Sequence, residues 1–248
     1  MEVNKVYSLL EIGKRKNLED YIYPNDDLGS SNNRVFLVCD GVGGENKGEV
    51  ASKIVAETLG NFLSNVKTDI TTDDIKSGFD LVITKINDYT KLYPAAIKMT
   101  TTLTLAVINE LNILLAWCGD SRLYYIRNNE IIWKSKDHSL VQNLIDTNEI
   151  TKAEAETHPL RNVITRSISV ETDFDKIDFY EEKNIGDNDY ILLATDGFFE
   201  QINDDILINC LKEDIYDKEE YFKNICEGKT NDNYSFQLIK LKKTNNGI

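Results

Sequence analysis

Acidic residues at the ends of apolar segments are the side chains of this sequence best suited to chemistry. Three of them lie just after a short run of Val, Leu, Ile, Ala or Cys and adjoin a glycine, and three more come just before such a run. Carboxylate oxygens held at the rim of a packed sheet are the ligands that hard cations such as Mg²⁺ and Mn²⁺ prefer. The six residues are Asp40, Asp120, Asp196, Glu19, Asp20 and Asp232.

Two interpretations of these carboxylates remain open from the residues alone. Asp beside Gly after a strand is a common turn signal, because glycine accepts positive φ and Asp bonds to its own backbone. If the strand ends instead converge, the same side chains form a site for two cations roughly 3.5–4 Å apart. Such a pair lowers the pKa of a bridging water and holds the attacking and leaving oxygens of a phosphoryl transfer.

The elements that must position these residues mix short strands with amphipathic helices. Apolar runs of strand length predict strands at 35–39, 103–108, 113–118, 123–126, 190–194 and 234–239. Helical spacing predicts long helices at about 51–63 and 75–86, and shorter ones from Ser139 and from a capping box at Thr151-Lys-Ala-Glu154. This element order is neither βαβ nor all-β, so it favours an α+β fold. We expect a central β-sandwich of two antiparallel sheets flanked by helices, in α-β-β-α layers.

Composition indicates an ordinary globular protein. With 248 residues, 41% of them apolar, the chain is long enough for one large domain, which we predict over residues 1–248. The net charge of −14, with no local Lys/Arg cluster, argues against nucleic acid and anionic membranes as partners.

The expected location is the cytoplasm, and the expected state a monomer. No apolar run reaches the roughly 18 residues of a membrane span, and the N-terminal segment lacks the pattern of a signal peptide. The four widely spaced cysteines form no C-x-x-C pair, and we interpret them as reduced core thiols.

Nine short segments, in one order along the chain, resemble the motifs of the metal-dependent protein phosphatase family, also called protein phosphatase type 2C. The resemblance runs from about Arg15 to Ile239, and the joint occurrence of the motifs is what makes it specific. They are Arg15-Lys-Asn-Leu-Glu-Asp20, Asp40-Gly-Val-Gly-Gly44, Gly48-Glu-Val-Ala-Ser52, Met99-Thr-Thr-Thr102, Gly119-Asp-Ser-Arg122, Lys136-Asp-His-Ser139, His158-Pro-Leu-Arg-Asn162, Ala194-Thr-Asp-Gly197 and Asp232-Asn233.

The resemblance implies a ligand set for two tightly bound ions, Mn²⁺ or Mg²⁺. Asp40 is similar to the family's carboxylate that bridges both metals, and Gly41 to the residue that lends its backbone carbonyl. Glu19 resembles the residue that completes the shell of the second metal. Asp196 and Asp232 resemble the ligands of the first.

Three further residues match family positions around the two metals. Asp120 resembles the ligand of a third, looser metal in bacterial-type members, and it shares that ion with Asp196. Asp20 is similar to the carboxylate that orients metal-bound water. Arg15 matches the phosphate-binding arginine, a role that suits a planar guanidinium because it can grip two phosphate oxygens at once. The alternative for Arg15 is a plain basic surface residue.

The histidines and cysteines are expected to play no catalytic part. Val42 stands where animal members carry a histidine proposed as general acid, so we expect water to protonate the leaving group. His138 and His158 are interpreted as structural, because a hard-cation site has no need of imidazole. Neither Cys39 nor Cys118 lies in the Cys-x5-Arg loop that a thiol phosphatase requires.

The predicted function is hydrolysis of phosphoserine and phosphothreonine in proteins, by direct attack of a hydroxide bridged between the metals. The substrates would be products of a serine/threonine kinase. A mobile flap is expected near residues 166–187. Two alternatives remain: a catalytically inactive member that binds phosphoproteins or a regulator, and a metal-dependent hydrolase of small phosphoesters.

Overall fold

Two antiparallel sheets form the centre of the protein. The computed structural model describes residues 1–25, 33–42 and 47–243. The first sheet has the order β1 (Glu2–Glu11), β11 (Tyr234–Lys242), β10 (Tyr190–Ala194), β7 (Arg122–Arg127) and β8 (Glu130–Lys134). The second has the order β2 (Asp20–Tyr23), β3 (Val35–Val42), β5 (Leu103–Ile108), β6 (Ile113–Cys118) and β9 (Asp178–Glu182), and β4 (Thr100–Thr101) pairs with the end of β3.

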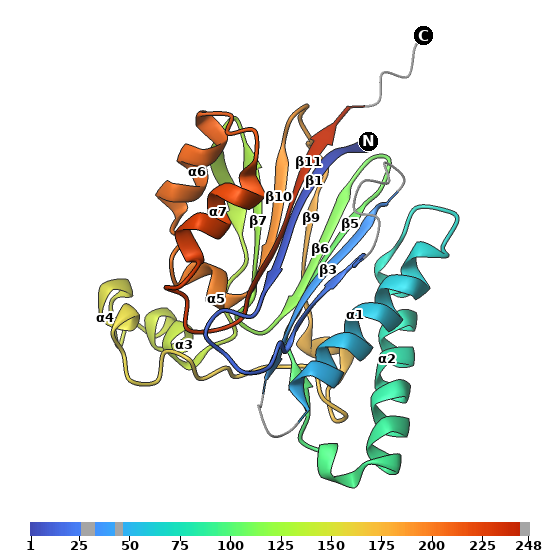
Figure 1. Cartoon of the computed structure of the whole chain (residues 1–248). Helices are drawn as coiled ribbons and strands as arrows, with labels where there is room; N and C mark the ends of the chain where they lie inside the picture. Colours follow the sequence, from blue (N-terminus) through green and yellow to red (C-terminus); the bar gives the residue numbers. More distant parts are fainter. Residues whose placement is uncertain (26–32, 43–46, 244–248) are drawn as a thin grey trace.

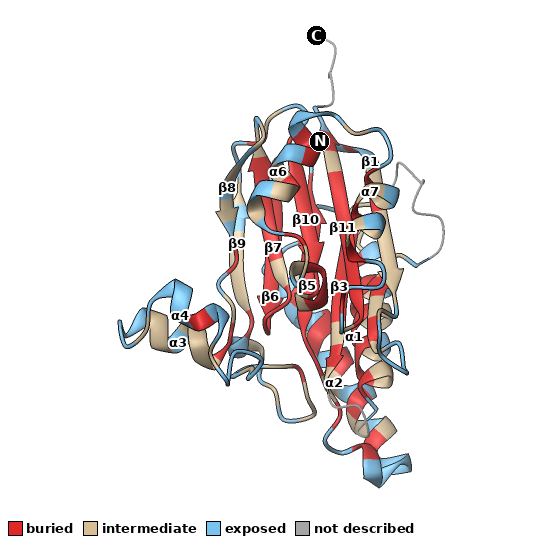
Figure 2. Cartoon of the chain, turned by 60° about the vertical axis from the view of Figure 1, so that its left-hand side comes forward, coloured by how far each residue is buried: buried red, intermediate tan, exposed pale blue. Residues whose placement is uncertain are grey.

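Helices cover the outer face of each sheet (Figure 1). The second sheet packs against α1 (Gly48–Ser64) and α2 (Thr72–Leu92), and the first packs against α6 (Asp204–Lys212) and α7 (Lys218–Cys226). The inner strands β5, β6 and β10 are therefore buried on both faces, whereas the edge strands β8 and β9 are largely half-buried or exposed, as Figure 2 shows. The predicted α-β-β-α layering is confirmed.

β3 illustrates why its sequence is a continuous apolar run. Val35, Leu37 and Cys39 belong to the core shared with α1 and α2. Phe36 and Val38 belong to the core between the two sheets. Because successive side chains point to opposite faces, a strand buried on both sides has no polar alternation.

Two short helices stand apart from the layers, α3 (Leu140–Asp146) and α4 (Lys152–Glu156) (Figure 2). The hydroxyl of Ser139 accepts a hydrogen bond from the Gln142 amide at 3.3 Å, which caps α3. Thr151 and Glu154 form the reciprocal bonds of a capping box at α4. Both predicted helix starts are confirmed. The remaining helical turns are η2 (Pro94–Ala96), η3 (Phe174–Lys176) and α5 (Asp196–Phe199).

The structure corrects the turn interpretation of two Asp-Gly pairs. Asp40-Gly41 lies inside β3, which continues to Val42 because Gly41 and Val42 pair with β4. Asp196 is the first residue of α5. Gly43 and Gly44 of the motif Asp40-Gly-Val-Gly-Gly44 lie outside the described residues.

Other expectations concern the whole chain. All four cysteines are buried and free, as predicted. In the part of the chain that the structure describes, no helix has the length and apolar character needed to cross a membrane. Within the segment 166–187, β9 is paired with β6 along its length, and the mobility of the rest stays a prediction.

Candidate active site

Adjacent strands of the second sheet bring Glu19, Asp20 and Asp40 together. In the antiparallel pairing of β2 with β3, Asp20 lies directly opposite Asp40. The Gly41 amide donates to the Glu19 carbonyl at 3.1 Å. The start of α1 packs on this point so closely that a Cβ on Gly41 would overlap the carbonyl oxygen of Gly48. Only glycine fits where the backbones of β3 and α1 touch, which explains Gly41 in the Asp40–Gly44 motif and Gly48 in the Gly48–Ser52 motif.

The first sheet contributes Asp196 and Asp232. β10 ends just before Asp196, and Asp232 precedes β11. A Cβ on Gly197 would overlap the carbonyl oxygen of Asn233, so these two segments are also in backbone contact. The side chain of Asn233 accepts from the Glu19 amide at 2.7 Å. This bond joins the segment before β11 of the first sheet to the segment before β2 of the second sheet.

Thr102 connects Asp40 to the Gly119–Asp120 turn. Its backbone amide donates to the Asp40 carbonyl at 2.8 Å, and its hydroxyl accepts from the Asp40 amide at 2.9 Å. That hydroxyl also lies 2.7 Å from the hydroxyl of Ser121. Asp120 follows Gly119, whose φ of 114° favours glycine. The turn between β6 and β7 is thereby fixed against β3.

Asp20 is a buried carboxyl with an unusual environment. Its Oδ2 accepts from the hydroxyls of Ser235 at 2.6 Å and Thr195 at 3.0 Å, and its Oδ1 has no partner among the described residues. Burial raises the pKa of Asp20 to about 7, opposed by the two hydroxyl hydrogen bonds and supported by the negative charge of Asp196. Ser235 and Thr195 were not predicted from the sequence. The one feature of the sequence that could have indicated them is proximity to the candidate carboxylates: Thr195 directly precedes Asp196, and Ser235 comes shortly after Asp232-Asn233.

The other aspartates share this electrostatic field. Burial raises the pKa of Asp40 well above its usual value, and the charges of Asp20, Asp196, Asp120 and Asp232 raise it further. The pKa of Asp196 is raised by burial and then by Asp232. Burial raises the pKa of Asp120 to about 7, again with a contribution from Asp196. Side chains from both sheets therefore act on one another as like charges.

Arg15 lies among the carboxylates. It forms a hydrogen-bonded ion pair with Asp232, although 57% of its side chain is exposed. This hydrogen bond raises the pKa of Arg15, and the charges of Glu19 and Asp196 contribute. The Arg15 guanidinium thus lies beside the acidic residues and is exposed to solvent, so that an anion could bind to it.

The donor set suits hard divalent cations. All candidate ligands are oxygens, and within the described part of the chain the buried Oδ1 atoms of Asp20 and Asp196 have no hydrogen-bond partner. Positive charge would relieve the repulsion among the aspartates. Among the described residues, however, no three Asp, Glu, His or Cys side chains converge closely enough to hold an ion in their present rotamers. The fit is therefore one of charge and chemistry, and binding requires the carboxylates to turn toward a common centre.

Other reactive side chains have structural roles. His138 accepts from the Gly119 amide at 3.1 Å, and His158 accepts from the Leu160 amide at 3.2 Å. Burial raises the pKa of both Cys39 and Cys118, which leaves their thiols protonated. The structural interpretation of the histidines and the exclusion of a thiol nucleophile agree with this geometry.

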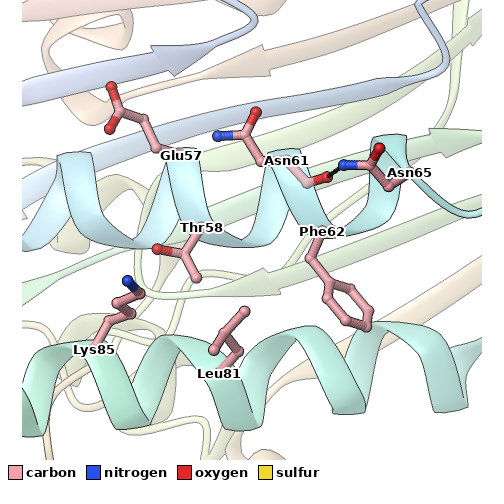
Figure 3. Close-up of a pocket in the computed structure, with 7 residues that line it drawn as sticks. All are labelled: Glu57, Thr58, Asn61, Phe62, Asn65, Leu81 and Lys85. Carbon is pink, nitrogen blue, oxygen red and sulfur yellow. Dashed lines mark hydrogen bonds between the residues drawn. The ribbon is translucent and has the colours of Figure 1, made fainter.

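A hollow elsewhere on the surface is unrelated to these residues. It has a volume of about 340 Å³ and lies between α1 and α2, with Phe62 and Leu81 among its lining residues (Figure 3). None of the candidate site residues lines it.

Comparisons with known proteins agree with the motif set. The family described as protein phosphatase 2C matches residues 17–239. Protein phosphatase PhpP of Streptococcus pneumoniae serotype 2 is 30% identical over 217 residues, which cover 84% of each chain. Serine/threonine phosphatase stp of Listeria monocytogenes serotype 4b is 29% identical over 197 residues, covering 76% of this chain and 77% of the relative.

Solved structures show the same fold. Serine/threonine phosphatase Stp1 from Staphylococcus aureus superposes with a TM-score of 0.82 at 26% identity, covering 98% of this chain and 96% of that one. The catalytic domain of PstP, solved with two manganese ions, gives a TM-score of 0.82 at 23% identity, with 98% and 100% coverage. Since the family match spans most of the chain and the fold agrees throughout, the chain belongs to the protein phosphatase 2C family.

Proposed function

We propose that the chain is an active protein serine/threonine phosphatase that depends on divalent metal ions. The observation that carries the proposal is the crowding of Asp20, Asp40 and Asp196 in one field of negative charge, in which the buried Oδ1 atoms of Asp20 and Asp196 have no hydrogen-bond partner among the described residues. Such a set is costly without cations. The relatives named as serine/threonine phosphatases point to the substrate class.

Two tightly bound ions, Mn²⁺ or Mg²⁺, would be held by the carboxylates. Asp40 would bridge them, with Glu19 and the Gly41 carbonyl on one side and Asp196 and Asp232 on the other. Asp120 would contribute to a third, looser ion, together with Asp196. When bound, the ions would supply an acidified water for attack on phosphorus and positive charge opposite the phosphoryl oxygens.

Arg15 binds the phosphoryl group of the substrate. Its exposed guanidinium has two parallel donors for phosphate oxygens, and it now uses one on Asp232. Substrate binding therefore competes with the Arg15–Asp232 ion pair, and metal binding at Asp232 would release Arg15 for the phosphate. The two events should favour each other.

Asp20 orients the attacking water and receives its proton. Because Ser235 and Thr195 both donate to Oδ2, the free oxygen for this task is Oδ1. Since no histidine lies at the position of Val42, the leaving oxygen takes its proton from solvent.

An inactive, phosphoprotein-binding member of the same fold is the alternative. A binding module has no use for five separated aspartates that destabilise one another when ionised, and nothing in the comparisons favours it. We further propose a monomer in the cytoplasm that reverses the work of a serine/threonine kinase, with residues 1–248 as one catalytic domain and a flap within 166–187.

The decisive experiment is phosphate release from a phosphothreonine peptide by the purified chain, with Mn²⁺, Mg²⁺, Ca²⁺ or a chelator. Mn²⁺ or Mg²⁺ should support turnover, a chelator should abolish it reversibly, and Asp40→Asn should be inactive under all conditions. A sugar phosphate and a nucleotide measured in parallel separate a protein phosphatase from a hydrolase of small phosphoesters. No phosphate release from any substrate at saturating Mn²⁺ would establish the inactive alternative.

A further inference from the structure

His138 binds the backbone of Gly119, the residue before Asp120. Its backbone amide donates to the Gly119 carbonyl at 2.9 Å, and its Nδ1 accepts from the Gly119 amide at 3.1 Å. Both polar groups of the Gly119 backbone are thus bound to one residue. The side chain is 7% exposed and stacks on Trp117 at a centroid distance of 6.1 Å.

The other ring nitrogen points toward a different segment. Because a backbone amide can only donate, Nδ1 carries no hydrogen, and Nε2 carries the proton of the neutral ring. Nε2 lies 3.0 Å from Oδ2 of Asp178, at the start of β9, and donates to it. Arg166 donates to the other carboxylate oxygen of Asp178 at 3.2 Å. Arg166 Nη1 is also 3.4 Å from Nε2, and since both nitrogens carry hydrogens they share Asp178 instead of bonding to each other.

The backbone carbonyl of His138 also contacts the segment that contains Arg166 and Asp178. It accepts from the Thr165 amide at 2.7 Å, directly before Arg166. His138 therefore contacts the Asp120 turn with two groups and the segment from Thr165 to Asp178 with two others. We call His138, Gly119, Asp178 and Arg166 the His138 junction.

We propose that His138 is a positioning residue that sets the metal affinity of Asp120 and couples the Asp120 turn to the segment 165–178 through Asp178 and Arg166. The inference rests on the proposed function of Asp120 as ligand of the looser ion. Removing a group that hydrogen-bonds directly to a metal ligand typically lowers metal affinity by about 10–100-fold. His138 bonds instead to Gly119, the residue before Asp120. Thr102 still links the turn to Asp40 through its hydroxyl contact with Ser121, so the lower end of that range is expected.

The test uses four substitutions in the 248-residue chain, together with Asp120→Ala as a check on the ligand role itself. His138→Leu removes both ring interactions. His138→Asn retains an oxygen acceptor near the Nδ1 position but does not reach Asp178, and Asp178→Asn weakens only the second link. His158→Leu is the matched control at the other histidine, whose ring makes a local turn bond.

Three readouts are needed, two of them independent of turnover. Hydrogen exchange of the Gly119 amide should be about tenfold faster in His138→Leu, the loss of roughly one hydrogen bond, and close to wild type in His138→Asn. Calorimetry should find the tight Mn²⁺ sites unchanged. The Mn²⁺ concentration for half-maximal phosphatase activity should rise about tenfold in His138→Leu and less in His138→Asn and Asp178→Asn.

Different failures have different meanings. Wild-type exchange and Mn²⁺ requirement in His138→Leu, or equal changes in His158→Leu, would overturn the inference while Asp120 remains a ligand. A wild-type Mn²⁺ requirement in Asp120→Ala would remove the ligand role itself, and the inference with it. If His138→Leu does not fold, His138→Asn and Asp178→Asn decide: wild-type behaviour of both overturns the proposal, and a raised Mn²⁺ requirement in both supports it.

Discussion

Replacing Asp20 by Asn should make the stability of the metal-free protein less dependent on pH. Burial raises the pKa of Asp20 from 3.8 to about 7. The unfolded chain releases this proton above about pH 4, whereas the folded chain keeps it until about pH 7. Folding therefore takes up a proton between these values. The contribution of Asp20 to stability is full below pH 3.8, is lost as the pH rises through that window, and stays lost above it.

The magnitude follows from the width of the window. A pKa change from 3.8 to about 7 corresponds to a penalty of about 4 kcal/mol on the ionised form. Between pH 4.5 and 7.5 ionisation of Asp20 should therefore lower the unfolding free energy of the wild-type chain by about 3 kcal/mol. Asn has no charge to lose, but its amide nitrogen would occupy the buried Oδ1 position, which has no partner, at a cost of about 1–3 kcal/mol. Asp20→Asn should be the less stable protein at pH 4.5, and its relative stability should rise by about 3 kcal/mol at pH 7.5.

Urea unfolding in a chelator, followed by tryptophan fluorescence at both pH values, measures this change. Asp80→Asn on the exposed face of α2 is the matched control, because the same substitution there removes no buried charge. The reasoning is refuted if the difference in unfolding free energy between wild type and Asp20→Asn is the same at the two pH values.

Three further predictions concern the site. Asp196→Asn should reduce kcat on a phosphothreonine peptide at saturating Mn²⁺ by far more than tenfold, and a loss below that, about 1.4 kcal/mol of barrier, would contradict its role. Arg15→Ala should raise KM by a factor that corresponds to about 1.5–3 kcal/mol, the strength of hydrogen bonds to charged groups. Arg15→Lys should recover part of this loss. Unchanged kinetics in Arg15→Ala would show that Arg15 is a basic surface residue without a role in phosphate binding. Gly197→Ala should lower the unfolding free energy by at least about 2 kcal/mol, because its methyl group meets the carbonyl of Asn233; urea midpoints equal to wild type would show that α5 and the start of β11 do not touch.

The sequence predicted best those elements whose burial is uniform. β5, β6 and β10 have the bounds expected from their apolar runs, because both faces of each strand are covered. β1, β8 and β9 were not predicted. These edge strands are only partly buried, so β8 alternates between exposed and half-buried residues and β9 contains several acidic residues. The short helices α6 and α7 also went unpredicted.

Candidate site residues could be chosen from the sequence, but their geometry could not. Motif order placed the carboxylates of Asp20, Asp40, Asp120, Asp196 and Asp232, and the structure brings them into one electrostatic field. The orientation of each side chain depends on partners distant in sequence, such as the hydroxyl of Ser235 on Asp20. The spacing of residues along the sequence does not show which side chains contact one another in the fold. The extension of β3 through Asp40 to Val42 was missed for the same reason, because it depends on pairing with β4.

The pairing of β1 with β11 has a consequence for synthesis on the ribosome. Among the described strands, β11 is the sole neighbour of β1, and their register runs from Glu2 opposite Lys242 to Glu11 opposite Tyr234. β1 therefore lacks this partner strand until residues more than 220 positions later have been made. Arg15 follows β1 and its partner Asp232 precedes β11, so the acidic site closes in the same step. A nascent chain that lacks β11 has neither the complete first sheet nor the Asp232 side of the site. The candidate site is therefore complete only after β11 has been made.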